Sequence, residues 1–414
     1  MLTRRGWGVL AAAFLLAFAG RLLGIQELYV LAAAAFVLVV VALWTVRVSP
    51  VRLAAARELH PAKVHAGTDS RVELAVVNRA SRRTPVLLVR DPFDGGRRQA
   101  RFLLAPLVPG EVARAAYRLP TNQRGVFSLG PLEVSRTDAF GLAVMNETVA
   151  SATELTVYPR VDVIAPLPHT IGHDPYAGAD HPNAIGLMGE DFYALRNYEV
   201  GDDLRRVHWP STARTGDLMI RQDEMPWQGR VTVVLDARRR AHTPESLELA
   251  ISAAASILSA SWTRRSLVRL VTSDGFDSGW AAGAAHAEAL MEHLAALQSS
   301  KRDRMADVLA GLRRSGNGGA IALVTAGASG DDLDAAARLR TRFGSVHLVV
   351  FEPSSWDPQL ASRRAFAPEP STVAAAGRRG GVIRVTSDAP FAQRWNEAMA
   401  RSPRASSTGA AVPS

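Results

Sequence analysis

The sequence predicts a multidomain chain with three parts: a two-helix transmembrane hairpin, a small β-sandwich, and an α/β domain with a doubly wound, mostly parallel sheet. Two apolar runs open the chain, short alternating segments follow over 51–161, and strands alternate with helical patterns over 230–401. The 414 residues are enough for several hydrophobic cores. A charged fraction of 21% with 48% hydrophobic residues excludes a mostly disordered chain.

The chain contains no cysteine, which excludes a disulfide scaffold, a cysteine-ligated zinc or iron–sulfur site, and a thiol nucleophile. Its net charge is +9, and every basic residue except Lys63 and Lys301 is an arginine. With so much alanine this pattern is typical of a GC-rich coding bias, and the alternative is an anionic partner. The arginines are scattered without an aromatic-interleaved basic stripe, so we expect no nucleic-acid binding.

Residues 1–50 are expected to form the transmembrane hairpin. The second apolar run, 28–46, has no charge and is close to the ~20 residues that a helix needs to cross the hydrocarbon core. The first run, 6–20, reaches that length only if it continues to residue 25, with Arg21 at the interface. A cleaved signal peptide is the alternative for the first run, but a second apolar run follows it instead of soluble sequence.

Arginines on both sides of the hairpin predict its orientation. Before the first run and after the second stand Arg4, Arg5, Arg47, Arg52 and Arg57. The connector between the runs carries Arg21 alone. The positive-inside rule therefore predicts a multi-pass protein of the cell membrane with two spans and both termini in the cytoplasm. The lipid bilayer is thus an expected partner.

The stretch 51–161 is expected to form an immunoglobulin-like β-sandwich. Its strand candidates are separated by Gly, Pro, Asn and Asp and lie at 71–77, 86–90, 112–119, 124–134 and 154–158. No catalytic constellation occurs among them. This domain is therefore interpreted as a spacer or binding module.

Pro, Gly and His dominate 162–186, which predicts a linker at the start of the segment 162–229. A metal site is the alternative for its polar cluster of His169, His173, Asp174, Asp180 and His181. The spacing of these residues does not place them on one helix face, and the prolines favour a flexible loop.

The region 230–401 alternates between strands and helices. Strands are expected at 231–236, 267–271, 320–324, 346–351 and 382–385, and helices at 284–297, 303–314, 331–343 and near 390–400. Thr243 is expected to cap a further helix that begins with Pro244 and Glu245. The small, polar tail 402–414 is expected to be disordered.

The segment 189–221 interleaves carboxylates and arginines with aromatic side chains. The residues that stand out are Gly189, Glu190, Asp191, Arg196, Tyr198, Gly201, Asp202, Asp203, Arg205, His208, Trp209 and Arg214. Such a mixture fits a partly buried ion-pair network that pins the segment onto the α/β domain. An active-site interpretation would instead use the acid and base groups Glu190, Asp191, Asp202 and His208.

These residues resemble the signature of the family called domain of unknown function 58. The shared features are a Gly-Glu-Asp-Phe start at 189–192, Arg-x-Tyr at 196–198, Gly-Asp-Asp-x-Arg at 201–205, and His-Trp followed by Ala-Arg at 208–214. The resemblance extends to Arg-Gly-x-Phe-x-Leu-Gly-Pro at 124–131 and to Asp-x-Phe-Gly-Leu at 138–142. With the two N-terminal spans it covers nearly the whole chain.

The resemblance implies a von Willebrand factor A-like C-terminal domain and no established catalytic activity. Members of the family are usually encoded beside a MoxR-type AAA+ ATPase, and often beside a transglutaminase-like membrane protein. We therefore expect a membrane-anchored, non-catalytic adaptor or assembly factor that binds protein partners in cell-envelope-related assembly. The alternative is a hydrolase-type enzyme that uses Glu190, Asp191 and His208, although the chain has no Gly-rich phosphate loop, Gly-x-Ser-x-Gly or His-Glu-x-x-His motif.

One departure from the von Willebrand A pattern bears on metal binding. A domain of that kind that binds Mg²⁺ places Asp-x-Ser-x-Ser after its first strand, and here that stretch is Asp236-Ala-Arg-Arg-Arg. Arg238 and Arg240 bring positive charge to the place of the ion, so we expect no metal or cofactor and a pairing of Asp236 with a neighbouring arginine. The carboxyl edge of the sheet, near Asp236, Ser273 and Thr325, is the expected interaction surface.

Overall fold

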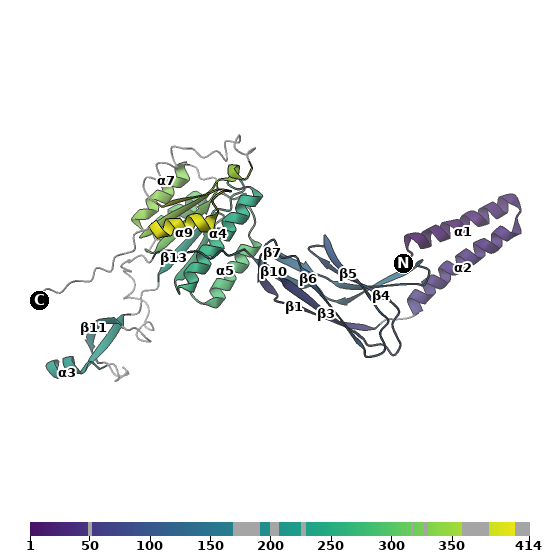
Figure 1. Ribbon diagram of the computed structural model, residues 1–414, viewed down its shortest axis with the longest axis horizontal. Coiled ribbons are helices and arrows are strands. Elements are labelled where there is room, and N and C mark those ends of the chain that lie inside the picture. Colours follow the sequence, from purple (N-terminus) through teal and green to yellow (C-terminus); the bar gives the residue numbers. More distant parts are fainter. Residues whose placement is uncertain are drawn as a thin grey trace. The chain divides into compact units, whose positions relative to one another are not determined.

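The computed structural model describes residues 1–48, 52–168, 191–198, 207–224, 229–315, 318–326, 330–357 and 381–401. Its contacts divide the chain into two compact units, Met1–Pro159 and Arg160–Ser414. The first unit contains a helical hairpin and a β-rich region, and the second contains an α/β region with a parallel sheet (Figure 1).

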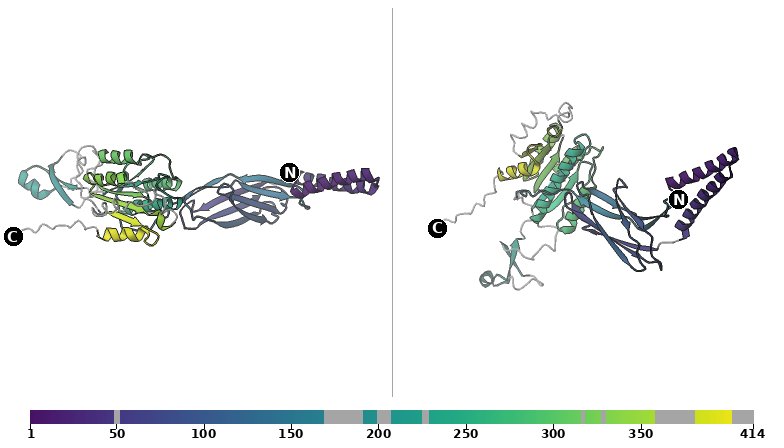
Figure 2. Two further views of the ribbon diagram at one scale, coloured as in Figure 1. Left: turned by 90° about the horizontal axis from the view of Figure 1, so that it is seen from above. Right: turned by 45° about the vertical axis from the view of Figure 1, so that its right-hand side comes forward.

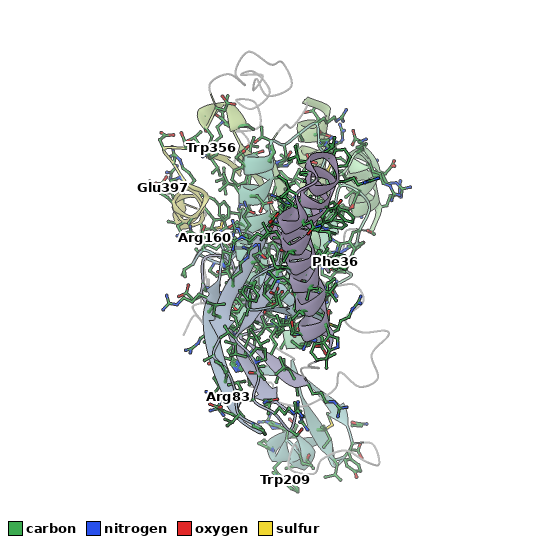
Figure 3. All side chains as sticks on the ribbon, turned by 90° about the vertical axis from the view of Figure 1, so that its right-hand side faces the viewer. Phe36, Arg83, Arg160, Trp209, Trp356 and Glu397 are labelled. Carbon is green, nitrogen blue, oxygen red and sulfur yellow. The ribbon has the colours of Figure 1, made fainter. Side chains whose placement is uncertain are left out.

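The hairpin consists of α1 (Arg4–Leu23) and α2 (Gln26–Val48). Both helices are long and apolar enough to cross a membrane. Thr3 caps α1 by accepting a hydrogen bond from the backbone of Gly6, and Gly24 ends the helix at a φ of 71°. Most of the large side chains are exposed, such as Phe36, which projects from the hairpin (Figure 3).

The hairpin is tied to the β-rich region through the loop that carries the Asp-x-Phe-Gly-Leu motif. The backbone N–H of Thr3 donates to the carbonyl of Leu142 over 2.8 Å, and Leu2 forms a β-bridge with Ala143. A Cβ at Gly6 would lie 2.1 Å from the Leu142 carbonyl oxygen, so this approach requires glycine. Leu142 and Ala143 also pack against buried side chains of α2.

The β-rich region contains two sheets. One has the order β1 (Leu53–His60), β3 (Ser70–Asn78) and β6 (Val112–Leu119), all antiparallel. The other has the order β2 (Lys63–His65), β10 (Thr153–Tyr158), β7 (Gly125–Leu129), β4 (Leu87–Phe93), β8 (Leu132–Thr137) and β9 (Val144–Ala150), with β5 (Arg98–Leu104) paired to β4. Buried residues alternate along β3, so one face of this strand lines the core.

The predicted single strand 124–134 is wrong, because this stretch forms two strands, β7 and β8. Gly130 and Pro131 separate them: proline lacks the N–H that a sheet ladder needs, and Gly130 has a φ of 93°. A side chain at Gly130 would also meet the guanidinium of Arg57, whose nitrogens lie 2.8 Å from an ideal Cβ position. The turn therefore leaves room for a buried arginine.

In the second unit, five strands form a fully parallel sheet in the order β14 (Leu267–Thr272), β13 (Arg230–Leu235), β15 (Ala320–Thr325), β16 (Ser345–Phe351) and β17 (Val382–Val385). Helices flank it (Figure 2): α4 (Pro244–Thr263), α5 (Ala284–Ala296), α6 (Met305–Ser315), α7 (Gly330–Arg338) and α9 (Phe391–Arg401). Short 3₁₀ turns lie at Leu339–Thr341 and Pro353–Ser355. Thr243 caps α4 as predicted, accepting from the backbone of Ser246.

The first described residues of the expected linker pack onto the α/β region. Trp395, fully buried, donates from its indole nitrogen to the carbonyl of Ala165 over 2.6 Å. The backbone of Ala165 in turn donates to the side chain of Asn396. The polar cluster around His169 and His181 and the tail 402–414 lie outside the described residues.

A buried histidine makes the stability of the α/β region depend on pH. Burial, and then the positive charge of Arg340, lower the pKa of His347 from its ordinary value of 6.5 to about 4. Above pH 6.5 the imidazole is neutral whether the chain is folded or unfolded. Between 6.5 and 4 only the unfolded chain takes up the proton, so stability is lost as the pH falls, by on the order of 3 kcal/mol in all.

Unfolding of the parent and of His347→Leu, measured from pH 7 to pH 4.5, tests this expectation. The parent should lose more stability than the variant over that interval, because carboxylates that titrate in both chains cancel in the difference. Two parallel pH profiles would show that His347 does not carry the effect.

Candidate functional site

The three predicted edge residues are brought together where the central strands end. Asp236 and Ser273 directly follow β13 and β14, and Thr325 is the last residue of β15. The backbone N–H of Asp236 donates to Val324 over 2.9 Å, and that of Ser273 donates to Leu235 over 3.0 Å. All three side chains are buried, so they form the floor of the edge and not its surface.

Asp236 is paired with Arg238, which confirms the predicted pairing with a neighbouring arginine. The guanidinium donates from Nε to Oδ1 over 2.9 Å and from Nη2 to Oδ2 over 2.8 Å. Thr325 donates its hydroxyl to Oδ2 over 2.8 Å, and the backbone of Arg238 donates to Oδ1 over 3.0 Å. Burial alone would raise the pKa of Asp236, but the hydrogen bonds and charge of Arg238 outweigh it and lower that pKa.

Arg238 also contacts two carboxylates that come from distant parts of the chain. Its Nη2 lies 2.8 Å from Asp332 on α7, and its Nη1 lies 3.4 Å from Asp303, which precedes α6. Asp303 is paired in addition with Arg240. The Arg238 side chain is only 4% exposed. A guanidinium thus holds together three carboxylates at the carboxyl edge of the sheet.

This arrangement limits what the centre of the edge can do chemically. Both oxygens of Asp236 already accept hydrogen bonds from Arg238 and Thr325, so the carboxylate is not poised to take a proton or a metal. Among the residues that the structure describes, no group of three or more His, Asp or Glu side chains has the geometry to hold a metal ion. The residues present therefore do not fit the Mg²⁺ of the von Willebrand A pattern.

Exposed basic side chains surround this closed centre, a feature that the sequence analysis did not identify. We call the exposed residues Arg239, Arg240, Lys301, Arg302 and Arg304 the basic rim. The two loops that carry them are joined by their backbones. Arg239 donates to Ser300 over 2.8 Å, Ser300 donates to Ala237 over 2.7 Å, and Arg304 donates to Ser273 over 3.0 Å. Runs of Arg and Lys directly after a strand and before a helix were the available signal.

The signature segment forms a small substructure of β11 (Asp191–Asn197), α3 (Trp209–Thr215) and β12 (Met219–Glu224), with β11 and β12 antiparallel. His208 lies at the N-terminal cap position of α3, where its ring nitrogen Nδ1 is 2.9 Å from the hydroxyl of Ser211. Trp209 is 67% exposed and Arg214 is exposed, and the backbone of Tyr198 donates to Leu218.

The proposed ion-pair network of this segment lies mostly outside the described residues. Those outside are Gly189, Glu190, Gly201, Asp202, Asp203 and Arg205, together with the side chains of Asp191 and Arg196. Both interpretations of the segment, structural network and acid–base site, therefore stay predictions. For His208 the structure shows a contact with Ser211 at the start of a helix.

Several solved structures resemble part of this chain, with low TM-scores. The CARDB domain of a Pyrococcus furiosus protein in complex with di-metal ions is 17% identical with a TM-score of 0.21, covering 26% of this chain and 93% of that domain. The putative ApaA protein from Bordetella pertussis is 16% identical with a TM-score of 0.19, covering 27% and 97%. β-Glucosidase 3B from Thermotoga neapolitana is 15% identical with a TM-score of 0.16, covering 26% and 17%. Likenesses this weak carry no argument about function.

The comparison with family models gives the informative match. No curated protein matches the chain. Residues 194–354, however, match the family described as "Protein of unknown function DUF58". The matched stretch runs from β11 through the signature segment and Asp236 to the turn after β16. The resemblance to this family that the signature residues imply is thus supported over the segment that contains the candidate site.

Proposed function

We propose that this protein is a membrane-anchored, non-catalytic adaptor whose α/β region binds a protein partner at the carboxyl edge of its sheet. In this proposal the α/β region is von Willebrand factor A-like, the β-rich region is an immunoglobulin-like sandwich, and both termini are cytoplasmic. The partner that the family resemblance suggests is a MoxR-type AAA+ ATPase, in cell-envelope-related assembly, with a transglutaminase-like membrane protein as a further partner.

The observation that carries the proposal is the contrast between the centre and the rim of the edge. Asp236 is buried and saturated by Arg238 and Thr325, so the centre offers neither a free base nor a metal site. The surrounding basic rim is exposed. A rigid centre with a charged rim favours recognition of a complementary acidic surface, because rim charges steer association and suppress wrong partners.

Two features support the membrane anchor. The side chains of the hairpin that would face lipid are apolar and exposed, among them Phe14 at 66%, Phe18 at 65% and Trp44 at 62%. Arginines gather where α2 ends, with Arg47 in its last turn and Arg52 just beyond it. From these arginines the positive-inside rule predicts a cytoplasmic location for that end of the helix and for the α/β region that follows it in the chain.

Reversing charge on the basic rim should weaken partner binding. We expect Arg239→Glu combined with Arg302→Glu to reduce the affinity of the detergent-solubilised chain for the MoxR-type ATPase of its own genome at least about tenfold, through lost attraction and added repulsion. Binding of the parent should also weaken as the salt concentration rises. Surface-immobilised chain and purified ATPase give both quantities directly.

Arg313→Glu combined with Arg314→Glu is the matched control. This pair reverses the same charge on exposed residues in the last turn of α6, which leads to the opposite edge of the sheet. An equal loss of affinity in both double variants would indicate a general charge effect. It would contradict the proposal that the partner binds at the carboxyl edge of the sheet. No binding by the parent at any salt concentration would exclude the ATPase as its direct partner.

A further inference from the structure

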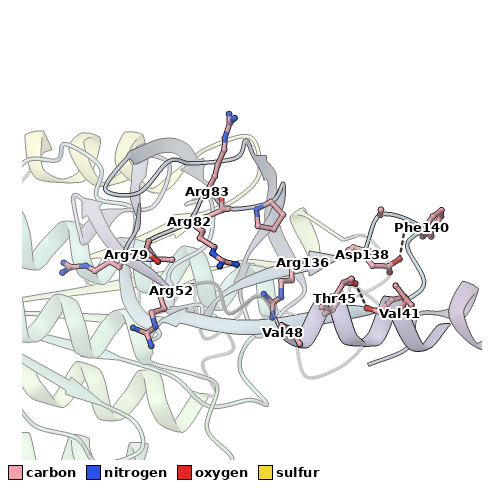
Figure 4. Close-up of a pocket in the computed structure, with 18 residues that line it drawn as sticks. Val41, Thr45, Val48, Arg52, Arg79, Arg82, Arg83, Arg136, Asp138 and Phe140 are labelled. Carbon is pink, nitrogen blue, oxygen red and sulfur yellow. Dashed lines mark hydrogen bonds between the residues drawn. The ribbon is translucent and has the colours of Figure 1, made fainter. Parts of the chain in front are cut away.

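A pocket of about 920 Å³ lies in the first unit, where the end of α2 meets the loops of the β-rich region (Figure 4). Its volume is within the range of small-molecule sites. One side is apolar and is formed by the last turns of α2, with Val41, Val46 and Val48. The other side is formed by the loop that follows β3 and by residues at the end of β8.

The polar side of the pocket is strongly basic. It is lined by five arginines, Arg52, Arg79, Arg82, Arg83 and Arg136. Among the described residues of the lining, only Asp138 carries a carboxylate. It accepts hydrogen bonds from the backbone N–H groups of Phe140, over 2.9 Å, and Ala143, over 2.6 Å. That carboxylate therefore stabilises its own turn, and the excess positive charge calls for an external anion.

Among the lining residues, Arg136 gives the most direct indication that the pocket binds a ligand. The residue is only 7% exposed, and within the described part of the chain its Nη1 has no hydrogen-bond partner. Its Nη2 donates to the sulfur of Met145 over 3.3 Å. Burial lowers the pKa of Arg136 and outweighs the charge of Glu147, which acts on the guanidinium in the opposite direction. Figure 4 shows the side chain extending beside Val48 at the end of α2, with Arg82 on the same side of the pocket and Arg83 pointing away. A buried donor without a partner is costly, so a bound acceptor would stabilise it.

The loop that carries the other arginines is held in place. The buried side chain of Asn78 donates to the carbonyl of Arg82 over 2.8 Å and to that of Leu107 over 3.0 Å. Thr84 and Leu107 exchange two further hydrogen bonds, one between their backbones and one through the Thr84 hydroxyl. The loop is thus ordered before any ligand arrives, which lowers the entropy lost on binding.

We propose that this pocket binds the headgroup of an anionic phospholipid, with the phosphate on Arg82 and Arg136 and an acyl chain along Val41 and Val48 of α2. The inference rests on the proposed membrane anchor, because only then does a bilayer interface lie at this end of the helix. Guanidinium groups match phosphate oxygens with paired donors, and basic pockets beside spanning helices recognise lipid headgroups. The apolar wall gives a reason for a lipid in place of a free phosphate.

Thermal unfolding of the full chain in detergent, titrated with defined lipids, tests the proposal. Phosphatidylglycerol should raise the melting temperature with an apparent Kd at least about tenfold lower than that of phosphatidylcholine. Arg136→Gln and Arg82→Gln should each weaken the phosphatidylglycerol effect about tenfold, since each removes a charge-assisted hydrogen bond to phosphate. Arg82 is exposed, so its variant keeps the fold even if the buried substitution does not.

Arg98→Gln is the matched control, because it removes the same charge from an exposed position opposite Phe93, at the other end of β4 from the pocket. It should bind like the parent. Equal stabilisation by phosphatidylcholine, or unchanged binding in both pocket variants, would overturn the proposal. If inorganic phosphate alone raised the melting temperature as much as phosphatidylglycerol, the pocket would be a site for free phosphate instead.

Extraction of membranes with alkaline carbonate tests the membrane anchor separately from the lipid site. Release of the chain into the soluble fraction would refute the anchor and the lipid site together. Retention in the membrane without any headgroup preference would refute the lipid site alone.

Discussion

Replacing Arg238 with alanine is expected to lower the unfolding free energy of the α/β region by on the order of 3–5 kcal/mol. The substitution leaves the carboxylate of Asp236, 0% exposed, without its charged partner. It also leaves Asp332, which is 13% exposed, beside an unfilled space. Because a domain of this size is stable by only ~5–15 kcal/mol, the loss should appear as early melting in thermal unfolding.

Arg240→Ala is the control for this experiment, since its side chain is 70% exposed although it pairs with Asp303. An exposed pair contributes ~1 kcal/mol or less, so the variant should melt close to the parent. Similar melting of the Arg238 and Arg240 variants would show that the buried guanidinium does not hold the edge together.

Removing the guanidinium from this site is expected to create a metal-binding site. Arg238→Ser together with Arg240→Ser restores the Asp-x-Ser-x-Ser pattern and removes the guanidinium from among Asp236, Asp332 and Thr325. Mg²⁺ should then recover stability, by about 2.7 kcal/mol at a concentration one hundred times its Kd, whereas the parent should show no shift. Stabilisation of the parent by Mg²⁺ would contradict the view that Arg238 takes the place of the cation.

Periodicity predicted most of the α/β region because its signals are local. The strands at 267–271 and 382–385 and the capped helix after Thr243 lie within a residue or two of their predicted bounds. The strands of the β-rich region were harder to predict. β1, Leu53–His60, shows no clean hydropathy alternation, and its pairing with β3 depends on residues that follow it in the chain. Cross-strand pairing of that kind is not encoded in a short window.

The candidate site, too, could be predicted only where its signals were local. Parallel strands must end at one edge, so the convergence of Asp236, Ser273 and Thr325 followed from the strand order alone. The participation of Asp303 and Asp332 did not, because they reach Arg238 only through the packing of α6 and α7. Arg136 was detectable in principle: it continues the buried alternation of Leu132 and Val134 along β8, which places a charged side chain on the core face.

The β-rich region contains a second buried ion pair. Substitutions that break it are expected to lower the unfolding free energy of this region more than others do. Arg57 donates to Asp91 over 3.1 Å from Nε and 2.6 Å from Nη2, with side chains 2% and 0% exposed. Tyr117 donates its hydroxyl to Asp91 over 2.7 Å, and Arg57 also donates to the carbonyl of Leu129 over 2.9 Å. Burial raises the pKa of Asp91, although the hydrogen bond from Tyr117 and the charge of Arg57 lower it. Burial therefore disfavours a charge strongly at this site.

Asp91→Ala should therefore cost on the order of 3–5 kcal/mol, because it leaves the Arg57 guanidinium buried without a counter-charge. Arg57→Met should cost a similar amount. The double variant should lose less than the sum of the two, because each single change already breaks the same pair. Denaturant unfolding of the four chains measures this coupling, with Arg118→Ala as the control: Arg118 and its partner Asp69 are 80% and 75% exposed, and that variant should unfold like the parent. Strictly additive losses would show that Arg57 and Asp91 contribute through packing and not through their pairing.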